Sequence, residues 1–268
     1  MIPELRRVTS ARAFITGLAS GGRYDFSSRE AQSALGVSPA AAKLALNRLS
    51  RQGLIASPAR GFYVIVPPEY RRLGCLPAEQ FVPALMERLG LRYYAGLLSA
   101  AQYHGAAHHR PQVFQVALAR RRRPIVCGAV RVSFFTRRRL ADIPVQSVNT
   151  PRGTLLVSTV EATAVDLVGY VHRAGGLDQV ATLLSELAEK IDPVLLATAA
   201  ATAPVSWAQR LGYLLDLVGA ADRTGPLRAY VAETARDLTP LLPGAPRAAA
   251  QRAPDWKLLV NATVEAEA

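Results

Sequence analysis

The chain has 268 residues, half of them hydrophobic, which is enough for one large domain or two ordinary ones. Its 32 Lys and Arg exceed its 20 Asp and Glu, so the formal net charge is +12. No apolar run reaches the length of a membrane span, and the first twenty residues contain no secretory or transit signal. These features argue against a membrane protein and a secreted protein.

The two cysteines, Cys75 and Cys127, stand in unrelated sequence contexts. They resemble neither a disulfide framework nor a metal knuckle, so we expect two ordinary part-buried thiols in a reducing cytoplasm.

The positive charge is concentrated in the first part of the chain. Residues 1–72 carry 11 Lys and Arg against 4 Asp and Glu, and residues 73–150 carry 11 against 3. Residues 151–268 carry 10 against 13 and are mildly acidic. This asymmetry predicts that the first half meets a polyanion.

Two helices are predicted at the start of the chain. Thr9 or Ser10 can cap the first, and Gly21-Gly22 ends it. Ser27 begins the second helix, and Glu30 follows at the spacing of a capping box, in which both side chains bind backbone N–H groups of the first turn.

A third helix follows after the turn Gly36-Val37. Ser38 caps it and Pro39 takes its first position, where no backbone donor is needed. Gly53 ends it. Residues 54–55 and 62–66 then predict two short strands joined by a turn. Helix, tight turn, helix and two-stranded wing in this order predict a winged helix-turn-helix, which places its last helix in the DNA major groove.

The third helix has an apolar stripe, Ala42, Leu46 and Leu49, that should face the core. Its other side carries small and polar residues that suit base edges or phosphates. The candidate DNA-binding residues are Ser27, Ser28, Ser38, Ala40, Lys43, Asn47, Arg51 and, at the wing tip, Arg60. The alternative is a helical hairpin whose Lys and Arg only solvate one face.

Residues 67–72 resemble a linker, which divides the chain into a DNA-binding domain, residues 1–70, and a second domain, residues 71–268. The second domain is predicted as α+β, with a small early sheet and a mostly helical second half. Helices are expected at residues 77–89, 91–103, 158–168, 177–190, 193–202, 207–218 and 226–236, and strands at 112–118, 125–126, 130–135, 155–157 and 256–260. Ser158 and Glu161 have the spacing of another capping box.

Two arginine runs flank the predicted strands of the second domain. They could contact phosphate or an acidic protein partner, or could lie in solvated loops. The runs are Arg120, Arg121, Arg122 and Arg123, and Arg137, Arg138 and Arg139.

The sequence contains no phosphate-binding Gly-Lys-Ser loop and no GxGxxG. His104 and His108 have the i, i+4 spacing of helical metal ligands, and His109 follows, but no HExxH glutamate accompanies them. Solvent-facing or capping histidines fit the pattern better than a metal site. Glu161 and Asp166 are five residues apart and share no helix face. We therefore expect no cofactor and no enzymatic activity.

Three segments resemble the AbiEi-family antitoxins of type IV toxin–antitoxin systems. The most specific is YYAGLLSAAQYHGAAHHRPQVFQV, Tyr93 to Val116, and the others are TPRGTLLVSTVEATAVDLV, Thr150 to Val168, and WKLLVN, Trp256 to Asn261. An N-terminal winged helix-turn-helix ahead of such a domain also matches the family's arrangement.

The resemblance implies a bacterial antitoxin that binds inverted repeats of double-stranded DNA in its own promoter and represses its operon. It implies that the second domain counteracts a nucleotidyltransferase-like toxin encoded beside it. Two alternatives remain open: a ligand-responsive or dimeric winged-helix transcription factor without a toxin, and an enzyme that modifies the toxin. No sequence pattern identifies toxin-contacting residues or a dimer interface.

Overall fold

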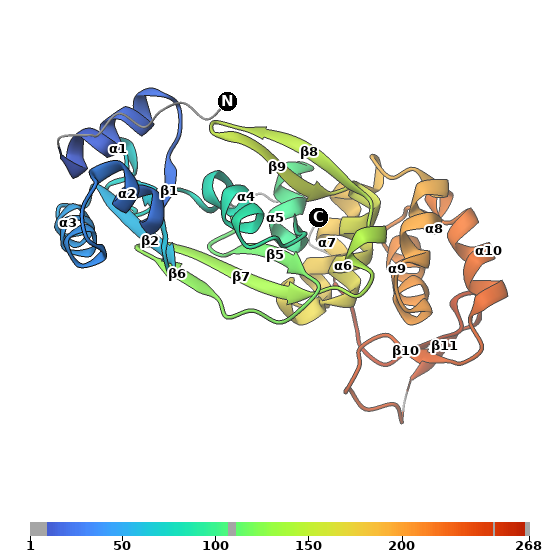
Figure 1. The fold of residues 1–268 in the computed structure, drawn as a ribbon. Coiled ribbons are helices and arrows are strands. Elements are labelled where there is room, and N and C mark those ends of the chain that lie inside the picture. Colours follow the sequence, from blue (N-terminus) through green and yellow to red (C-terminus); the bar gives the residue numbers. More distant parts are fainter. Residues whose placement is uncertain (1–9, 107–110, 249, 266–268) are drawn as a thin grey trace. The chain divides into compact units, whose positions relative to one another are not determined.

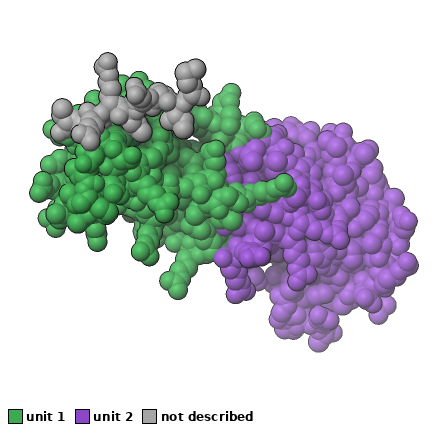
Figure 2. Space-filling model, viewed as in Figure 1, with its two compact units in different colours: residues 1–92, 122–134, 147–155 green, residues 93–121, 135–146, 156–268 purple. Residues whose placement is uncertain are grey.

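A computed structural model describes residues 10–106, 111–248 and 250–265 of the chain. The chain forms two compact units, coloured separately in Figure 2. Unit 1 comprises residues 1–92, 122–134 and 147–155, and unit 2 comprises residues 93–121, 135–146 and 156–268. The units interleave along the chain, so the predicted division of roles at residue 70 stays a prediction.

The first part of unit 1 is a winged helix-turn-helix, as predicted (Figure 1). Strand β3 lies between the other two strands and pairs antiparallel with both. The short strand β1 was not predicted. The elements are α1 (Ala11–Ser20), β1 (Asp25–Ser27), α2 (Ser28–Leu35), α3 (Pro39–Arg51), β2 (Ile55–Ala59) and β3 (Phe62–Ile65).

Aromatic and aliphatic side chains from the three helices and the three strands form the core of this module. Phe14 of α1 meets Phe26 of β1 edge to face, with ring centroids 5.2 Å apart, and Phe26 stacks on Tyr63 at 5.5 Å. Leu46 and Leu49 of α3 are buried in the same cluster. The stripe predicted from the sequence therefore holds α3 against the core and leaves its opposite side outward.

The rest of unit 1 contains η1 (Pro68–Tyr70), α4 (Ala78–Arg88), β6 (Ile125–Cys127) and the first part of β7 (Val130–Thr136). It also contains the end of a hairpin formed by β8 (Val145–Thr150) and β9 (Gly153–Ser158). At the tip of this hairpin, Arg152 lies 3.3 Å from the ring centroid of Tyr24 and donates to Gln80 Oε1 at 2.7 Å. This stacked and hydrogen-bonded arginine ties the hairpin tip to other segments of unit 1.

The largest sheet has six strands in the order β6-β7-β5-β4-β9-β8. Within unit 2, β4 (Tyr94–Ala95) pairs antiparallel with β5 (Phe114–Leu118) and parallel with β9 through Ala95 and Val157. Strands β7, β8 and β9 each continue from one unit into the other. The sheet thus uses six strands that are consecutive in the chain, from Tyr94 to Ser158, in an order that differs from the sequence order.

The helix predicted over residues 91–103 is wrong in its first half. Residues 94–95 form β4, and α5 (Leu97–Tyr103) begins after Gly96. Gly96 is extended, and its N–H donates to the Gln115 carbonyl at 3.0 Å. A Cβ atom on this residue would lie 2.6 Å from the Phe135 ring. The apolar run is buried on both sides of the bend, and periodicity alone does not separate a buried strand from a buried helix.

Five helices cover the second half of unit 2, in agreement with the prediction. The central helix, α6, is apolar on nearly all sides and packs against α5, α7, α8 and α9, as a fully buried helix requires. None of the helices in the described ranges is long and apolar enough to cross a membrane. The helices are α6 (Val160–Gly169), α7 (Leu177–Ala188), α8 (Pro193–Ala201), α9 (Val205–Leu217) and α10 (Gly225–Thr234), with short turns η2 (Leu140–Asp142), η3 (Val171–Arg173) and η4 (Ala221–Arg223).

The last stretch of the chain returns to the core of unit 2. Strands β10 (Thr239–Pro240), β12 (Leu258–Val260) and β11 (Gln251–Ala253) form a small sheet in that order, and the turn η5 (Pro254–Trp256) lies between β11 and β12 in the chain. Trp256 is buried and donates to Asp216 Oδ2 at 2.7 Å. A Cβ atom on Gly212 would lie 2.1 Å from its ring, so this position requires glycine. The predicted C-terminal strand is confirmed as β12.

Candidate functional site

Local hydrogen bonds at the start of α2 and α3 orient the helix pair. Ser27 Oγ accepts from the Glu30 N–H at 3.0 Å, and Glu30 Oε2 accepts from the Ser27 N–H at 2.7 Å, which confirms the predicted capping box. Gly36 closes α2 with φ of +62°, a conformation that glycine adopts without strain. Ser38 Oγ then accepts from the Ala41 N–H at 3.3 Å and begins α3.

The outward side of α3, called the α3 surface below, is a continuous set of exposed side chains. It includes the residues predicted from the sequence, and it adds Leu44 and Arg48, which the prediction omitted. Its members are Ala40, Lys43, Leu44, Asn47, Arg48 and Arg51.

Leu44 lies near the middle of the α3 surface, and 59% of it is exposed. On an ideal helix it points almost directly away from the buried stripe of Ala42, Leu46 and Leu49. Helical periodicity alone predicts this outward direction, although apolar side chains are more commonly buried.

The wing ends in a tight turn between β2 and β3. Arg60 is exposed in this turn, and Gly61 follows with φ of +72°. Ser57 Oγ donates across the hairpin to the carbonyl oxygens of Ala59 and Phe62, at 3.0 Å each. The Ser57 hydroxyl therefore stabilises the wing turn, and Arg60 lies at the tip of the wing.

Two predicted DNA-binding residues, Ser27 and Ser28, make contacts within the module, and only Ser27 is too buried to reach DNA. The prediction for Ser27 is corrected, because Ser27 is 3% exposed and its hydroxyl is engaged in the α2 cap. Ser28 is half-buried, and its N–H donates to the Gly61 carbonyl at 3.2 Å, which joins α2 to the wing turn.

The cations of the α3 surface and wing tip have no acidic partner among the residues that the structure describes. Within this module an ion pair joins Arg23 and Glu30, with 2.5 Å between a guanidinium nitrogen and Glu30 Oε1. Burial acts to raise the pKa of Glu30, but hydrogen bonds from Arg23 and Ser27 outweigh it and lower that pKa. Glu30 is thus an ionised structural group, and the module leaves its outward Lys and Arg available to an external anion.

The arginine runs of the second predicted domain divide by exposure. Arg120, Arg121, Arg123, Arg138 and Arg139 are exposed, whereas Arg122 is half-buried with its guanidinium 5.8 Å from the Phe134 ring centroid.

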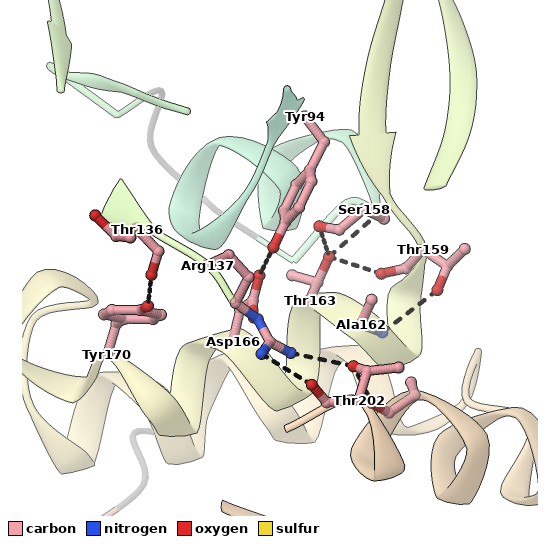
Figure 3. A network of polar contacts seen from close by, with 11 residues as sticks. Tyr94, Thr136, Arg137, Ser158, Thr159, Ala162, Thr163, Asp166, Tyr170 and Thr202 are labelled. Atoms are coloured by element: carbon pink, nitrogen blue, oxygen red, sulfur yellow. Dashed lines mark hydrogen bonds and ion pairs between the residues drawn. The ribbon is translucent and has the colours of Figure 1, made fainter. Parts of the chain in front are cut away.

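The prediction for Arg137 is wrong, because its side chain is 2% exposed and bound inside unit 2. Figure 3 shows Arg137 pointing at Asp166 and Thr202. Its Nε donates to Asp166 Oδ1 at 2.7 Å, and its terminal nitrogens donate to the carbonyl and hydroxyl of Thr202 at 3.3 Å. The guanidinium also lies 4.9 Å from the Trp207 ring centroid. Each of its three nitrogens therefore donates to a partner within the protein.

Tyr94 completes this buried network from strand β4. Its hydroxyl donates to Asp166 Oδ2 at 2.6 Å, so both carboxylate oxygens are satisfied. Burial raises the pKa of Asp166, and Arg137 and Tyr94 oppose that shift. Burial and the charge of Asp166 together raise the pKa of Tyr94. The arrangement supplies a neutralised, hydrogen-bonded core rather than an acid or base open to a substrate.

Two family models match the chain. One, described as "Transcriptional regulator, AbiEi antitoxin", matches residues 16–66, and the other, the "AbiEi antitoxin C-terminal domain", matches residues 94–217. The chain belongs to the AbiEi antitoxin family. The first AbiEi match coincides with the winged helix-turn-helix, and the second contains Tyr94, Arg137 and Asp166.

Among solved structures, the crystal structure of the RV2827C protein from Mycobacterium tuberculosis is similar, with a TM-score of 0.69 and 19% sequence identity. The match covers 95% of this chain and 92% of that chain, and at this identity it shows a shared fold. A comparison with curated protein sequences found no significant match.

The AbiEi-like segment from Tyr93 to Val116 contains structural contacts. His104 is buried, and its Nε2 donates to the Ser158 carbonyl at 2.8 Å, which defines its tautomer. Burial lowers the pKa of His104. Its carbonyl oxygen accepts from Lys190 Nζ. His108 and His109 lie outside the described residues, and within residues 10–106, 111–248 and 250–265 no group of three or more His, Cys, Asp or Glu side chains could hold a metal ion.

In the AbiEi-like segment from Thr150 to Val168, the residue that caps α6 differs from the predicted one. Thr159 Oγ1, not Ser158, caps the helix by accepting from the Ala162 N–H at 3.3 Å. Ser158 is buried and binds the Thr163 hydroxyl at 2.7 Å. Glu161 is buried too, and it accepts from the Asp192 N–H at 3.2 Å. The cap therefore lies one residue later than predicted, in a turn whose side chains are buried or half-buried.

Proposed function

We propose that this AbiEi-family protein binds inverted repeats in its own promoter and represses its operon, and that it counteracts a nucleotidyltransferase-like toxin. The observation that carries the DNA-binding part is the α3 surface. This surface combines amide, cationic and apolar side chains on one helix. The buried stripe of α3 and the caps of α2 and α3 orient the helix so that these side chains face outward.

The chemistry of this surface fits the major groove. Asn47 can form two hydrogen bonds to an adenine edge, and Lys43 can donate to guanine or phosphate. The small side chain of Ala40 near the helix start permits close approach to the base pairs. Arg51 and, on the wing, Arg60 are suited to phosphates, which position the protein on the duplex.

The toxin-directed part rests on the family described as antitoxins. The polar network around Asp166 in unit 2 is enclosed, so we propose that it stabilises this unit and that exposed residues of the second domain contact the toxin. Arg120, Arg121, Arg123, Arg138 and Arg139 are exposed candidates for that contact or for phosphate.

We infer a binding function and not a catalytic one. The buried carboxylates Asp166 and Glu161 each have hydrogen-bond partners inside the protein. A winged-helix regulator without a toxin is the second candidate, since the α3 surface would serve it equally. Co-expression with the adjacent toxin gene, scored for growth, separates the two.

The decisive experiment replaces Lys43 and Asn47 with Ala in the full chain. Each base-contacting side chain contributes roughly 1–3 kcal/mol, so footprinting on the promoter should show loss of specific binding. Growth rescue from the toxin should persist, because the substituted residues lie in the predicted DNA-binding domain. Arg223→Ala, which removes an exposed charge from η4 of unit 2, is the control and should footprint normally.

Salt provides an independent measurement on the unmodified protein. Phosphate contacts release counterions, so a protein that makes 6–10 of them loses about 10³–10⁵ in affinity between about 50 and 200 mM salt. A flat salt response, or a normal footprint from the double variant, would contradict the proposed placement of α3 in the groove.

A further inference from the structure

The two cysteines, 52 positions apart in the sequence numbering, meet inside unit 1. Both are free thiols and both are buried, Cys75 completely and Cys127 with 8% of its surface exposed. Cys75 follows the linker after the wing, and Cys127 ends strand β6. Their separate sequence contexts gave no indication of this meeting.

The two backbones run past each other in opposite directions. The Ala129 N–H donates to the Leu73 carbonyl at 2.7 Å. One step further, a Cβ atom on Gly74 would lie 3.3 Å from the Gly128 Cα. Cys75 follows Gly74 and Cys127 precedes Gly128, so the close approach of the two glycines brings the segments that carry the thiols together.

Glycine makes this approach possible. Gly128 has φ of +58° and lies at the first central position of the two-residue turn between β6 and β7, as a type II′ turn requires. A Cβ atom there would lie 2.1 Å from the Leu73 carbonyl oxygen. With glycine on both sides, no side chain separates the strands next to the thiols.

The thiols contact each other directly. The Cys75 thiol donates a hydrogen bond to the Cys127 sulfur, which raises the pKa of Cys75 and lowers the pKa of Cys127. The Ser57 N–H, in wing strand β2, also donates to the Cys127 sulfur. Cys127 is therefore the better nucleophile of the pair and the more exposed one, while Cys75 is placed to resolve an oxidised Cys127.

We propose that Cys75 and Cys127 are an oxidation site that forms an intramolecular disulfide with a hydroperoxide as oxidant. The Cys127 thiolate attacks one peroxide oxygen, an S–O bond forms, and the O–O bond breaks to release hydroxide, which becomes water. The Cys75 sulfur then attacks the resulting sulfenic sulfur and displaces its hydroxide, which leaves as water with the Cys75 proton. Two thiols lose two electrons and two protons, and hydrogen peroxide becomes two waters.

The test uses the native full-length protein at low micromolar concentration. Hydrogen peroxide is added, remaining thiols are blocked with iodoacetamide before unfolding, and the product is measured by intact-mass and peptide mass spectrometry. We expect a monomer that has lost two hydrogens, contains a Cys75–Cys127 cross-linked peptide, and regains both thiols with dithiothreitol. Cys75→Ser and Cys127→Ser should each prevent the cross-link.

A matched control keeps two cysteines and changes only their geometry. Val126 neighbours Cys127 and is 66% exposed, on the opposite face of β6. In the Val126→Cys, Cys127→Ser double variant we expect at least about tenfold less intramolecular disulfide, because proximity is what raises the effective thiol concentration.

Two results would overturn the proposal. One is a native protein that keeps both thiols, or oxidises them separately to sulfinic acid, while the peroxide is consumed by a control thiol. The other is equal cross-linking in the wild type and the displaced-cysteine variant. Neither depends on DNA or toxin binding.

Discussion

The α3 surface and the buried network of unit 2 use similar residues for opposite purposes. On α3, Lys43, Arg48 and Arg51 are exposed and have no acidic partner in the described parts of the chain. In unit 2, Arg137 is enclosed, each of its three nitrogens donates to an acceptor, and its guanidinium lies near the Trp207 ring. The exposed cations are available to an external anion, which we propose to be DNA, whereas the buried ion pair is completed within the fold.

The largest expected effect is on the buried network. Asp166→Ala leaves the Arg137 guanidinium buried without its counter-charge and removes the acceptor of the Tyr94 hydroxyl. Breaking a buried pair in this way costs about 3–5 kcal/mol. The free energy of unfolding in urea, followed by circular dichroism, should fall by that amount.

The neighbouring arginine provides the control for this comparison. Arg138 is exposed, and Arg138→Ala should change stability by no more than about 0.5 kcal/mol. Equal decreases in the free energy of unfolding for Asp166→Ala and Arg138→Ala would contradict the stabilising role of the buried network.

A smaller effect is expected on the α3 surface, from Leu44. We expect this exposed side chain to contact a thymine methyl in the major groove. Burial of one methyl or methylene group contributes about 0.8 kcal/mol, or roughly fourfold in affinity. Replacing that thymine with deoxyuridine in the footprinted half-site should weaken wild-type binding by this factor.

The Leu44→Ala variant makes the measurement specific. It should bind thymine-containing and deoxyuridine-containing DNA equally, with unchanged stability. If both proteins respond alike to the missing methyl at every thymine, Leu44 does not face a base. If neither protein binds promoter DNA at all, the proposed regulatory function fails first.

The smallest expected effect concerns the pH dependence of stability. Burial holds the pKa of His104 below its ordinary value of 6.5, so the unfolded chain takes up this proton more readily than the folded chain. The contribution of neutral His104 is complete above about pH 6.5 and declines as the pH falls toward the folded pKa.

His104→Gln tests this contribution, because the amide can keep the donor to Ser158 and does not titrate. Between about pH 7.5 and about pH 5.5, the unfolding free energy of the wild type should fall more than that of the variant. Parallel pH curves for the two proteins would show that His104 is not the titrating group.

Several local features followed from the sequence because they depend on neighbouring residues. Ser27 with Glu30, and Ser38 with Pro39, begin α2 and α3 as predicted. The buried stripe of α3 was also correct, since it needs only helical periodicity. The same periodicity places Leu44 on the exposed side of α3, although Leu44 is apolar.

Other features depend on distant segments and could not be obtained in this way. Arg137 stands in the same run as the exposed Arg138 and Arg139, and only its pairing with Asp166, 29 positions later, distinguishes it. The bend at Gly96 depends on Phe135 and Gln115. Short-range patterns contain no information on such contacts.

The winged helix-turn-helix, its capped helices, the helical second half and the family resemblance were predictable from the amino-acid sequence, because caps, turns and periodic apolar residues act over a few positions. The buried arginine, the strand β4 in place of a helix and the proximity of Cys75 to Cys127 became apparent only in the folded protein. Those outcomes depend on desolvation and close packing between segments far apart in the chain, which no local pattern encodes.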